Sequence, residues 1–359
     1  MVAMVATVAY CVAGSNAGAP GGAALHVLEC DTATGETKIV QDVPGTEGAT
    51  YFVFSPDNAT LYAAAAREGK RGALIALPFD GKRLGAPQTL AELPCEPPCH
   101  VELSPDGCRL SYAAYLSGAF GFLDLKERRL HSAVLPDAAP GPRKDRQKKP
   151  YAHQTFYTPG GSLMGVCDLG CDRILFYKAG EPGGLDTPEA ALAADPGDGP
   201  RHALFHPSGR FMFVVNELSS TVASFSWNGE TFGRVCKVSM LPEGCVLPPE
   251  RTKASAIKLS ADGSLLMASN RGHDSIAFFA VGADGTLTPR GVAPLRGRFP
   301  RDFEPLPGGR FVLAGHKLSD EFRVYALDAE PETNEARLEP AWDPVPCWKP
   351  LCFKFPRSK

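Results

Sequence analysis

A repeating pattern of polar and apolar positions runs through the chain. Each repeat opens on a four-residue polar turn, which is followed by an apolar run, a polar break and a strand in which apolar and polar residues alternate. One copy has its apolar run at residues 210–215, its break at 216–220 and its alternating strand at 221–227. Continuous apolarity is typical of a strand buried on both faces, and alternation is typical of a strand with one exposed face. The pattern therefore predicts stacked sheets of short antiparallel strands.

The turns are the most regular part of the repeat. They contain Pro or Asp and close on Gly or Asn, which are the residues that adopt turn conformations at low steric cost. Six copies occur, at residues 55–58, 104–107, 158–161, 206–209, 260–263 and 306–309. Their spacing of 46 to 54 residues leaves room for about four strands of ordinary length in each unit.

A seventh unit is predicted near the N-terminus. Residues 5–13 and 24–29 form two strands around a loop at 14–22, but this unit has no first strand of its own. The C-terminal run 347–355 is expected to supply that strand and close a ring. Seven such units predict an all-β fold, a single seven-bladed β-propeller over residues 1–359 closed by N- and C-terminal strands. A WD40 propeller is disfavoured, because Trp342-Asp343 occurs once rather than in every unit.

Composition and charge narrow the possible partners. Hydrophobic residues make up 44% of the 359 residues, enough for a large core, and the 37 Gly and 33 Pro fit many turns. The net charge of −3 lacks the basic surplus of a nucleic-acid-binding protein. No stretch reaches the roughly 18 apolar residues of a membrane span. We therefore expect neither nucleic acid nor membrane as partner, and the oligomeric state stays open, although a ring closed by its own termini can be monomeric.

The cysteines point to a reducing compartment. Eleven is an odd number, and the close pairs Cys95/Cys99 and Cys167/Cys171 have three-residue spacers without a matching set of histidines. This pattern favours reduced core thiols over a zinc site or a disulfide framework. Residues 1–14 are apolar but contain no Lys or Arg, so they lack the positive segment of a signal peptide. We expect a cytoplasmic protein without metal or cofactor.

The most basic segment of the chain lies between two predicted blades. Residues 136–150 contain five cations: Arg143, Lys144, Arg146, Lys148 and Lys149. A run of like charge in a loop is most often solvated. We interpret this segment as a solvated inter-blade loop in preference to a binding element.

The repeat also predicts which side chains meet at one mouth of the propeller. Positions can be counted from the last residue of each turn. The residue eight positions before it enters the first strand of the blade, and the residues seven and eight positions after it leave the second strand. All three lie at the same end of the blade. In blades two and three these positions are mostly small or apolar. In blades four to seven the polar and charged members at these positions are His153, Asp168, Arg201, Asn216, Glu217, Asn270, Arg271, Arg301, His316 and Lys317. One positively charged wall is typical of a site for a small anionic substrate beside an acid or base.

Each of these residues also has a purely structural interpretation. Strand-end Asp, Asn and Arg residues often bind neighbouring backbone, and for any single position the two interpretations have similar weight. Asn216 and Asn270 are expected to be scaffold. The convergence of His153, Arg201 and Glu217 with Arg271 favours a site.

Six phrases spaced along the chain resemble the lactonase family of seven-bladed propellers. They begin at Ala152, Val166, Gly199, Val215, Ser269 and Pro300. The family includes bacterial propeller-type 6-phosphogluconolactonases and fungal carboxy-cis,cis-muconate cyclases. The resemblance implies that His153, Arg201, Glu217 and Arg271 line the active site. The sequence departs from the family pattern at Tyr151, Ala114 and His316, which puts the substrate in doubt more than the fold.

The chemistry expected from this resemblance is hydrolysis of a sugar lactone. It needs an activated water, a base and donors for the oxyanion. The sequence contains neither Gly-x-Ser-x-Gly nor His-Glu-x-x-His, so neither a serine esterase nor a zinc hydrolase is indicated. Glu217 is the first choice of base and His153 the second, because flanking arginines weaken a carboxylate as a base. Arg201 and Arg271 polarise the carbonyl or bind the anion.

Four further residues are expected to bind the substrate, and they are Arg301, Lys317, Asp168 and His316. The predicted substrate is 6-phosphogluconolactone, an intermediate of the pentose phosphate pathway. Two alternatives stay open, namely a muconate-type lactonising cyclase and a non-catalytic propeller that acts as a binding scaffold.

Overall fold

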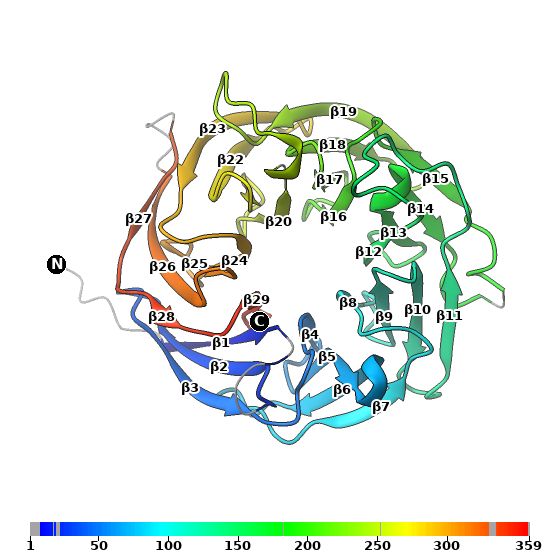
Figure 1. Cartoon of the computed structure of the whole chain (residues 1–359), viewed down its shortest axis with the longest axis horizontal. Coiled ribbons are helices and arrows are strands. Elements are labelled where there is room, and N and C mark those ends of the chain that lie inside the picture. Colours follow the sequence, from blue (N-terminus) through cyan, green and yellow to red (C-terminus); the bar gives the residue numbers. More distant parts are fainter. Residues whose placement is uncertain are drawn as a thin grey trace.

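Seven antiparallel sheets, six of four strands and one of five, form a ring around a central channel in the computed structural model of the protein (Figure 1). The structure describes residues 8–16, 18, 22–181, 183–251, 253–329 and 335–357. The seven-bladed β-propeller predicted from the turn repeat is thereby confirmed. Residues 5–7 of the predicted first strand lie outside the described part.

The blades follow one another in sequence order around the ring. Blade 1 comprises β29 (Pro350–Lys354), β1 (Val8–Ser15), β2 (Leu25–Asp31) and β3 (Thr37–Val43), and blade 2 comprises β4 (Phe52–Phe54), β5 (Thr60–Arg67), β6 (Arg71–Pro78) and β7 (Gln88–Glu92). Blade 3 comprises β8 (His100–Leu103), β9 (Arg109–Ala114), β10 (Ala119–Asp124) and β11 (Leu130–Val134), and blade 4 comprises β12 (Ala152–Tyr157), β13 (Met164–Asp168), β14 (Arg173–Tyr177) and β15 (Ala190–Ala193).

The second half of the ring has the same organisation. Blade 5 comprises β16 (Pro200–Phe205), β17 (Phe211–Asn216), β18 (Thr221–Trp227) and β19 (Phe232–Ser239), and blade 6 comprises β20 (Ala254–Leu259), β21 (Leu265–Asn270), β22 (Ser275–Val281) and β23 (Leu287–Pro294). Blade 7 comprises β24 (Pro300–Pro305), β25 (Phe311–His316), β26 (Glu321–Asp328) and β27 (Arg337–Pro340), with β28 (Val345–Pro346) also paired to β26. The described residues also form the short 3₁₀ helices η2 (Glu68–Lys70), η3 (Leu169–Cys171) and η4 (Pro249–Arg251).

The predicted turns join the first and second strands of blades 2 to 7. Their last residues are in the left-handed region, with φ of 59° at Asn58 and 71° at Gly209. In the first of these turns the Asn58 N–H donates to the Ser55 carbonyl at 2.9 Å. Because Gly and Asn tolerate positive φ, their occurrence at the last position of each turn predicts this backbone conformation.

The ring is closed by pairing between the two ends of the chain. Strand β29 forms the inner strand of blade 1, and Ala13 of β1 lies opposite Phe353. The Phe353 side chain is fully buried, and its ring lies 6.1 Å from that of Phe322 in blade 7. This closing strand is the one predicted from residues 347–355. Apolar clusters fill the other blade interfaces in the same way, as where Phe120 of blade 3 packs on Tyr177 of blade 4 with ring centroids 4.7 Å apart.

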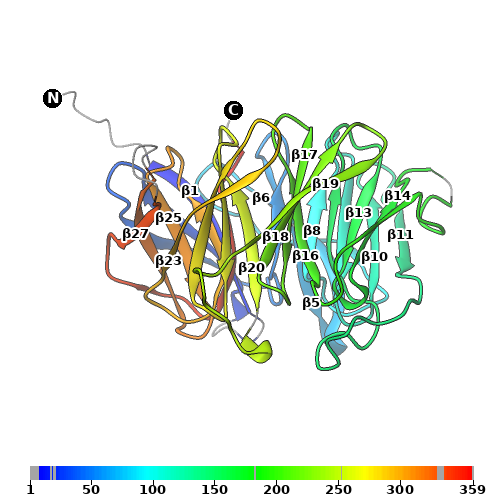
Figure 2. The same cartoon turned by 90° about the horizontal axis from the view of Figure 1, so that it is seen from above.

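Strand direction decides which loops surround each mouth of the channel. The outer strand of each blade connects to the inner strand of the next blade at one end of the ring. The second strand of every blade also ends there. Residues that precede inner strands and residues that follow second strands therefore meet at this mouth. The longest described connections at this end join β11 to β12 and β19 to β20, and the second carries η4. Both project at the lower edge of Figure 2, in green and yellow-green. None of the helices in the described residues has the length and apolar character needed to cross a membrane.

Replacing Phe353 with Ala tests the closure. Removing a fully buried Phe is expected to lower the free energy of unfolding by about 3 to 5 kcal/mol, because it leaves a cavity between blades 1 and 7. The measurement is denaturant unfolding, with exposed Val246→Ala as the control. Equal stability of the two variants would contradict closure by this strand.

Candidate active site

One buried carboxylate binds three arginines at the mouth that carries the long loops. Glu217 directly follows β17 and is 3% exposed. Its Oε2 lies 2.6 Å from Nη2 of Arg271 and 3.1 Å from Nε of Arg201. Its Oε1 lies 2.5 Å from Nη2 of Arg146, which belongs to the loop between β11 and β12. Blades 5 and 6 and one inter-blade loop therefore meet at a single acid.

Backbone carbonyls fix two of these guanidinium groups. Nη1 of Arg201 donates to the Ser255 carbonyl at 2.9 Å. In Arg271, Nε donates to the Lys253 carbonyl at 3.1 Å and Nη2 to the Ala254 carbonyl at 2.9 Å. Both groups are thus held by backbone at the start of β20, and groups fixed in this way need little reorganisation when a ligand binds.

The electrostatic environment of Glu217 keeps it ionised. Burial alone would raise the pKa of its carboxyl, but Arg271, Arg146 and Arg201 together hold that pKa well below the usual range. Both oxygens already accept contacts from guanidinium groups. Glu217 is therefore a permanent negative charge at neutral pH and a weak base.

Three histidines line the channel beside this cluster. The ring of His202 lies 5.1 Å from that of His153 and 5.2 Å from that of His100. His153 is 5% exposed, and its Nδ1 has no hydrogen-bond partner among the described residues. Burial, followed by the charge of Arg201, lowers the pKa of His153 well below its usual value. Its imidazole is therefore neutral at neutral pH and able to accept a proton.

Two more cations lie on the blade 7 side of the mouth. Arg301 is in β24 and Lys317 follows β25, and within the described ranges neither side chain has a hydrogen bond or an ion pair. Burial lowers the pKa of Lys317 to about 8, with further contributions from Arg301, Arg271 and Lys349. Half-buried cations without a partner favour binding of an anion at this place.

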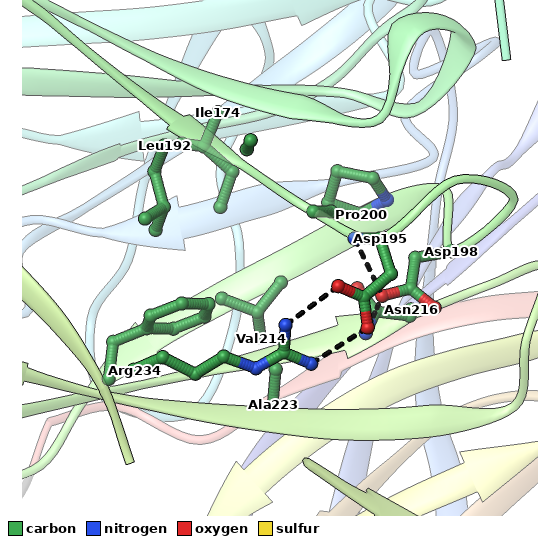
Figure 3. A pocket seen from close by; sticks show the side chains of 12 residues that line it. Ile174, Leu192, Asp195, Asp198, Pro200, Val214, Asn216, Ala223 and Arg234 are labelled. Atoms are coloured by element: carbon green, nitrogen blue, oxygen red, sulfur yellow. Dashed lines mark hydrogen bonds and ion pairs between the residues drawn. The ribbon is translucent and has the colours of Figure 1, made fainter. Parts of the chain in front are cut away.

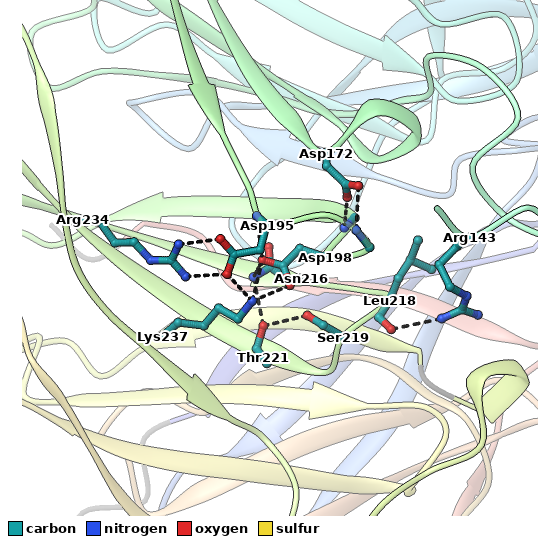
Figure 4. Close-up of polar contacts among 12 residues, drawn as sticks. Arg143, Asp172, Asp195, Asp198, Asn216, Leu218, Ser219, Thr221, Arg234 and Lys237 are labelled. Atoms are coloured by element: carbon teal, nitrogen blue, oxygen red, sulfur yellow. Dashed lines mark hydrogen bonds and ion pairs between the residues drawn. The ribbon is translucent and has the colours of Figure 1, made fainter. Parts of the chain in front are cut away.

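A polar network in blade 5 supports the backbone around Glu217 (Figure 4). The N–H groups of Glu217 and Leu218 donate to the carbonyls of Gly199 and Asp198, at 2.8 and 2.9 Å. The Asp198 carboxylate is in turn bound by Lys237 Nζ at 2.7 Å. This network positions the acid without contacting the arginines.

A small pocket next to that network is too small for a substrate. It lies among Ile174, Leu192 and Val214, with Asp195 and Asp198 on one side (Figure 3). Its volume is about 10 Å³, and a single water requires roughly that much space. We assign it no binding role.

Two of the residues expected to bind substrate are instead engaged within their own blades. Oδ1 of Asp168 accepts the Tyr151 and Gly170 N–H groups at 2.9 and 3.1 Å, and Oδ2 binds Nε of Arg173 at 2.9 Å. His316 is fully buried, and its Nε2 lies 3.0 Å from the Tyr325 hydroxyl.

The two strand-end asparagines are bound in a similar way. The Asn270 side chain accepts the Gly272 N–H at 2.9 Å and donates to Ser220 Oγ at 2.9 Å. Asn216 donates to Thr221 Oγ1 at 3.0 Å. These contacts hold neighbouring backbone and side chains in place, which is the scaffold role expected for Asn216 and Asn270.

Arg146 is the site residue that the sequence analysis missed. The loop at 136–150 was interpreted as solvated, but it is anchored at the mouth. Gln147 Nε2 donates to the Leu169 carbonyl at 3.0 Å and to Asp172 Oδ1 at 2.8 Å. Arg143 Nη1 donates to the Leu218 carbonyl at 3.2 Å (Figure 4). The position of this long loop could have indicated its role. The loop leads into an inner strand, so it must pass over the mouth.

Tyr151, one of the departures from the family pattern, forms an aromatic wall with Tyr115. The Tyr151 ring stacks on Tyr115 with centroids 4.7 Å apart, and Tyr115 lies 5.5 Å from His153. Ala114 is buried beneath this wall, in β9. Within the described ranges, no group of three or more His, Cys, Asp or Glu side chains could hold a metal ion.

Comparisons with known proteins agree over the whole ring. A family model described as "Lactonase, 7-bladed beta-propeller" matches residues 10–355. The 6-phosphogluconolactonase of Bacillus subtilis (strain 168) is 30% identical over 348 residues, which cover 93% of this chain and 95% of that protein. The structure of a periplasmic gluconolactonase from Pseudomonas aeruginosa is similar with a TM-score of 0.83 at 26% identity, covering 97% of this chain and 99% of that one. A protein from Lactobacillus plantarum has a TM-score of 0.85 at 27% identity, covering 98% and 100%.

Replacing Glu217 with Gln tests the charge balance of the cluster. The variant is expected to lose about 3 to 5 kcal/mol of unfolding free energy at pH 7, because three guanidinium groups lose their buried counter-charge. Since the folded pKa of Glu217 is lowered, its contribution is fully present above the unfolded pKa of about 4.3 and disappears as pH falls further.

The measurement is denaturant unfolding at several pH values. Glu92→Gln, at an exposed ion pair with Arg71, is the matched control and should have a smaller effect. A loss at Glu217 that persists unchanged at acidic pH would contradict the ionised state.

Proposed function

Because the chain belongs to the lactonase family of seven-bladed β-propellers, we propose that it hydrolyses a sugar lactone and that 6-phosphogluconolactone is its substrate. The relatives named 6-phosphogluconolactonase and gluconolactonase support a lactone as the substrate class. The pentose phosphate pathway would then be its metabolic setting. A cytoplasmic location belongs to the same proposal, and it is supported by eleven cysteines that are all free thiols.

The observation that carries this proposal is the surplus of positive charge around Glu217. Arg146, Arg201 and Arg271 contact this one carboxylate. Arg301 and Lys317 lie on the same mouth without an anionic partner among the described residues. Lactone hydrolysis turns a neutral carbonyl into an oxyanion and then a carboxylate. Preorganised cations in a buried site stabilise charge that develops during a reaction.

His153 is the base in the mechanism that we propose. Its neutral imidazole takes a proton from a water as the water oxygen attacks the lactone carbonyl carbon. The tetrahedral oxyanion that forms is stabilised by Arg201, with Arg301 and Lys317 nearby. The bond from the carbonyl carbon to the ring oxygen then breaks, and the ring oxygen receives the proton from His153. The product is a hydroxy acid, which releases its own proton to solvent.

Glu217 has a positioning role in this mechanism. Both of its oxygens are occupied by the guanidinium groups of Arg201, Arg271 and Arg146. Nδ1 of His153, in contrast, has no hydrogen-bond partner among the described residues. This assignment reverses the preference that the sequence alone suggested.

A lactonising cyclase that acts on a carboxylated muconate is the second candidate. The stacked Tyr115 and Tyr151 rings beside His153 offer an aromatic surface on which a flat, unsaturated ligand can stack. The same cations would bind its carboxylates. Supplying the purified protein with each substrate and identifying the products distinguishes the two reactions.

Substitutions at the cluster test the proposed roles. Arg201→Ala is expected to lower kcat for lactone hydrolysis by about 100-fold or more, the usual effect of losing one oxyanion donor. His153→Gln is expected to lower it by about 100- to 10,000-fold. The measurement is acid release from 6-phosphogluconolactone, corrected for spontaneous hydrolysis. Exposed Arg129→Ala is the control, and unchanged rates in both site variants would refute the assignment.

The pH profile tests Lys317. Its ammonium loses a proton as pH rises through about 8, so kcat/KM should fall above that pH. Lys317→Arg keeps the positive charge and should move the decline to higher pH, because arginine stays protonated to about pH 12. An identical decline in both proteins would show that Lys317 does not contribute charge to the site.

A further inference from the structure

Blades 5 and 7 have the same spacing and can be compared residue by residue. Their first strands begin at Pro200 and Pro300, and their second strands end at Asn216 and His316. Positions one hundred apart are therefore equivalent. The backbone contacts agree, because Leu218 N–H donates to the Asp198 carbonyl and Leu318 N–H to the Arg298 carbonyl, at 2.9 and 3.2 Å.

In blade 5 these positions are closed by internal packing. The Asp198 carboxylate is bound by Lys237 (Figure 4). The Leu218 side chain is 3% exposed and covers Gly199. A Cβ at position 199 would lie 2.6 Å from Leu218 Cγ, so glycine is required there.

In blade 7 the equivalent positions are open. Arg298 replaces the acid, Phe299 replaces the glycine, and the Leu318 side chain is 51% exposed. Phe299 has a φ of 67°, a conformation in which a bulky side chain is strained. Such strain is concentrated at functional sites, where it forms part of the binding arrangement.

The Phe299 ring lines a cleft beside the arginine cluster. The cleft has a volume of about 290 Å³ and is also lined by Arg251, Lys253, Arg298 and Arg271. Arg271 Cζ and Lys253 Nζ lie 5.2 and 5.9 Å from the ring centroid. Arg271 therefore belongs to both the cleft and the Glu217 site.

Positive charge dominates this cleft. Of its two carboxylates, Asp274 is engaged with the Phe299 N–H at 2.7 Å, and Glu250 is exposed. Arg251 donates to the Gly272 carbonyl at 2.6 Å, whereas Arg298 and Lys253 have no side-chain hydrogen bond or ion pair among the residues described. Ligand sites commonly combine an aromatic surface with a few such charged groups.

We propose that this cleft between blades 6 and 7 is a second anion subsite, which binds the phosphate of the substrate while the Phe299 ring packs against the sugar. The proposal rests on the lactonase function given above and specifies its substrate class. A phosphorylated aldonic acid has two anionic groups at opposite ends. Two cationic sites that share Arg271 match that distribution of charge, and guanidinium groups suit the geometry of phosphate oxygens.

Three variants test the subsite, namely Arg298→Ala, Lys253→Ala and Phe299→Gly. The last restores the residue found in blade 5, so it relieves backbone strain rather than adding it. The measurement is the ratio of kcat/KM for 6-phosphogluconolactone to that for gluconolactone. Arg298→Ala and Lys253→Ala are each expected to lower this ratio by about ten-fold or more, as for loss of a charged hydrogen bond. Phe299→Gly is expected to lower kcat/KM for both lactones, because both contain the sugar ring that packs on Phe299. Arg210→Ala is the matched control, because Arg210 also lies over a ring, 5.3 Å from the Phe211 centroid, at the opposite end of blade 5.

A ratio that is unchanged in both cation variants, or that falls equally in the control, would overturn the subsite. If the wild-type protein hydrolyses neither lactone, the proposed function fails, and calorimetric binding of 6-phosphogluconate and gluconate tests the subsite separately. Selective weakening of 6-phosphogluconate binding by Arg298→Ala would then support it. Equal binding of 6-phosphogluconate to the variant and wild type would exclude it.

Discussion

The contact of one carboxylate with three guanidinium groups is the interaction on which the mouth of this propeller depends. Without Glu217, Arg146, Arg201 and Arg271 would be neighbouring like charges in a poorly solvated place, where mutual repulsion is large. With it, they are held in fixed positions and still leave a net positive site. The contact is possible because the ring brings two neighbouring blades and one long loop to the same point.

Most of the fold follows from local rules. Asn58 and Gly209 end their turns with positive φ, which these residue types predict. The first blade lacks an inner strand in its own sequence, and the C-terminal strand supplies it. The repeat register likewise placed Arg201, Glu217 and Arg271 at one mouth. It could not show the direction of each side chain, so Asp168 and His316 were expected to face a ligand although their own blades bind them. Arg146 was missed because an irregular loop has no register from which its position can be counted.

The functional interpretation depends on differences between equivalent blades. Blade 5 fills its mouth positions with Asp198 and Leu218, which pack internally and support the acid. Blade 7 has the exposed Arg298 and Leu318 at the same places, with Phe299 where blade 5 has Gly199, and it adds charge without a counter-ion among the described residues. Symmetry accounts for the scaffold, and the departures from symmetry mark the positions at which selection acted on something other than packing.

The central claim is that Glu217 stays ionised and holds arginines, so that another group takes the proton from water. Its most direct test is a ¹³C NMR titration of the Glu217 carboxyl, assigned by comparison with the Gln variant. The account predicts a resonance that stays in its carboxylate position below the ordinary glutamate pKa of about 4.3. A Glu217 carboxyl that gains its proton near neutral pH would contradict the account and return this residue to the role of base.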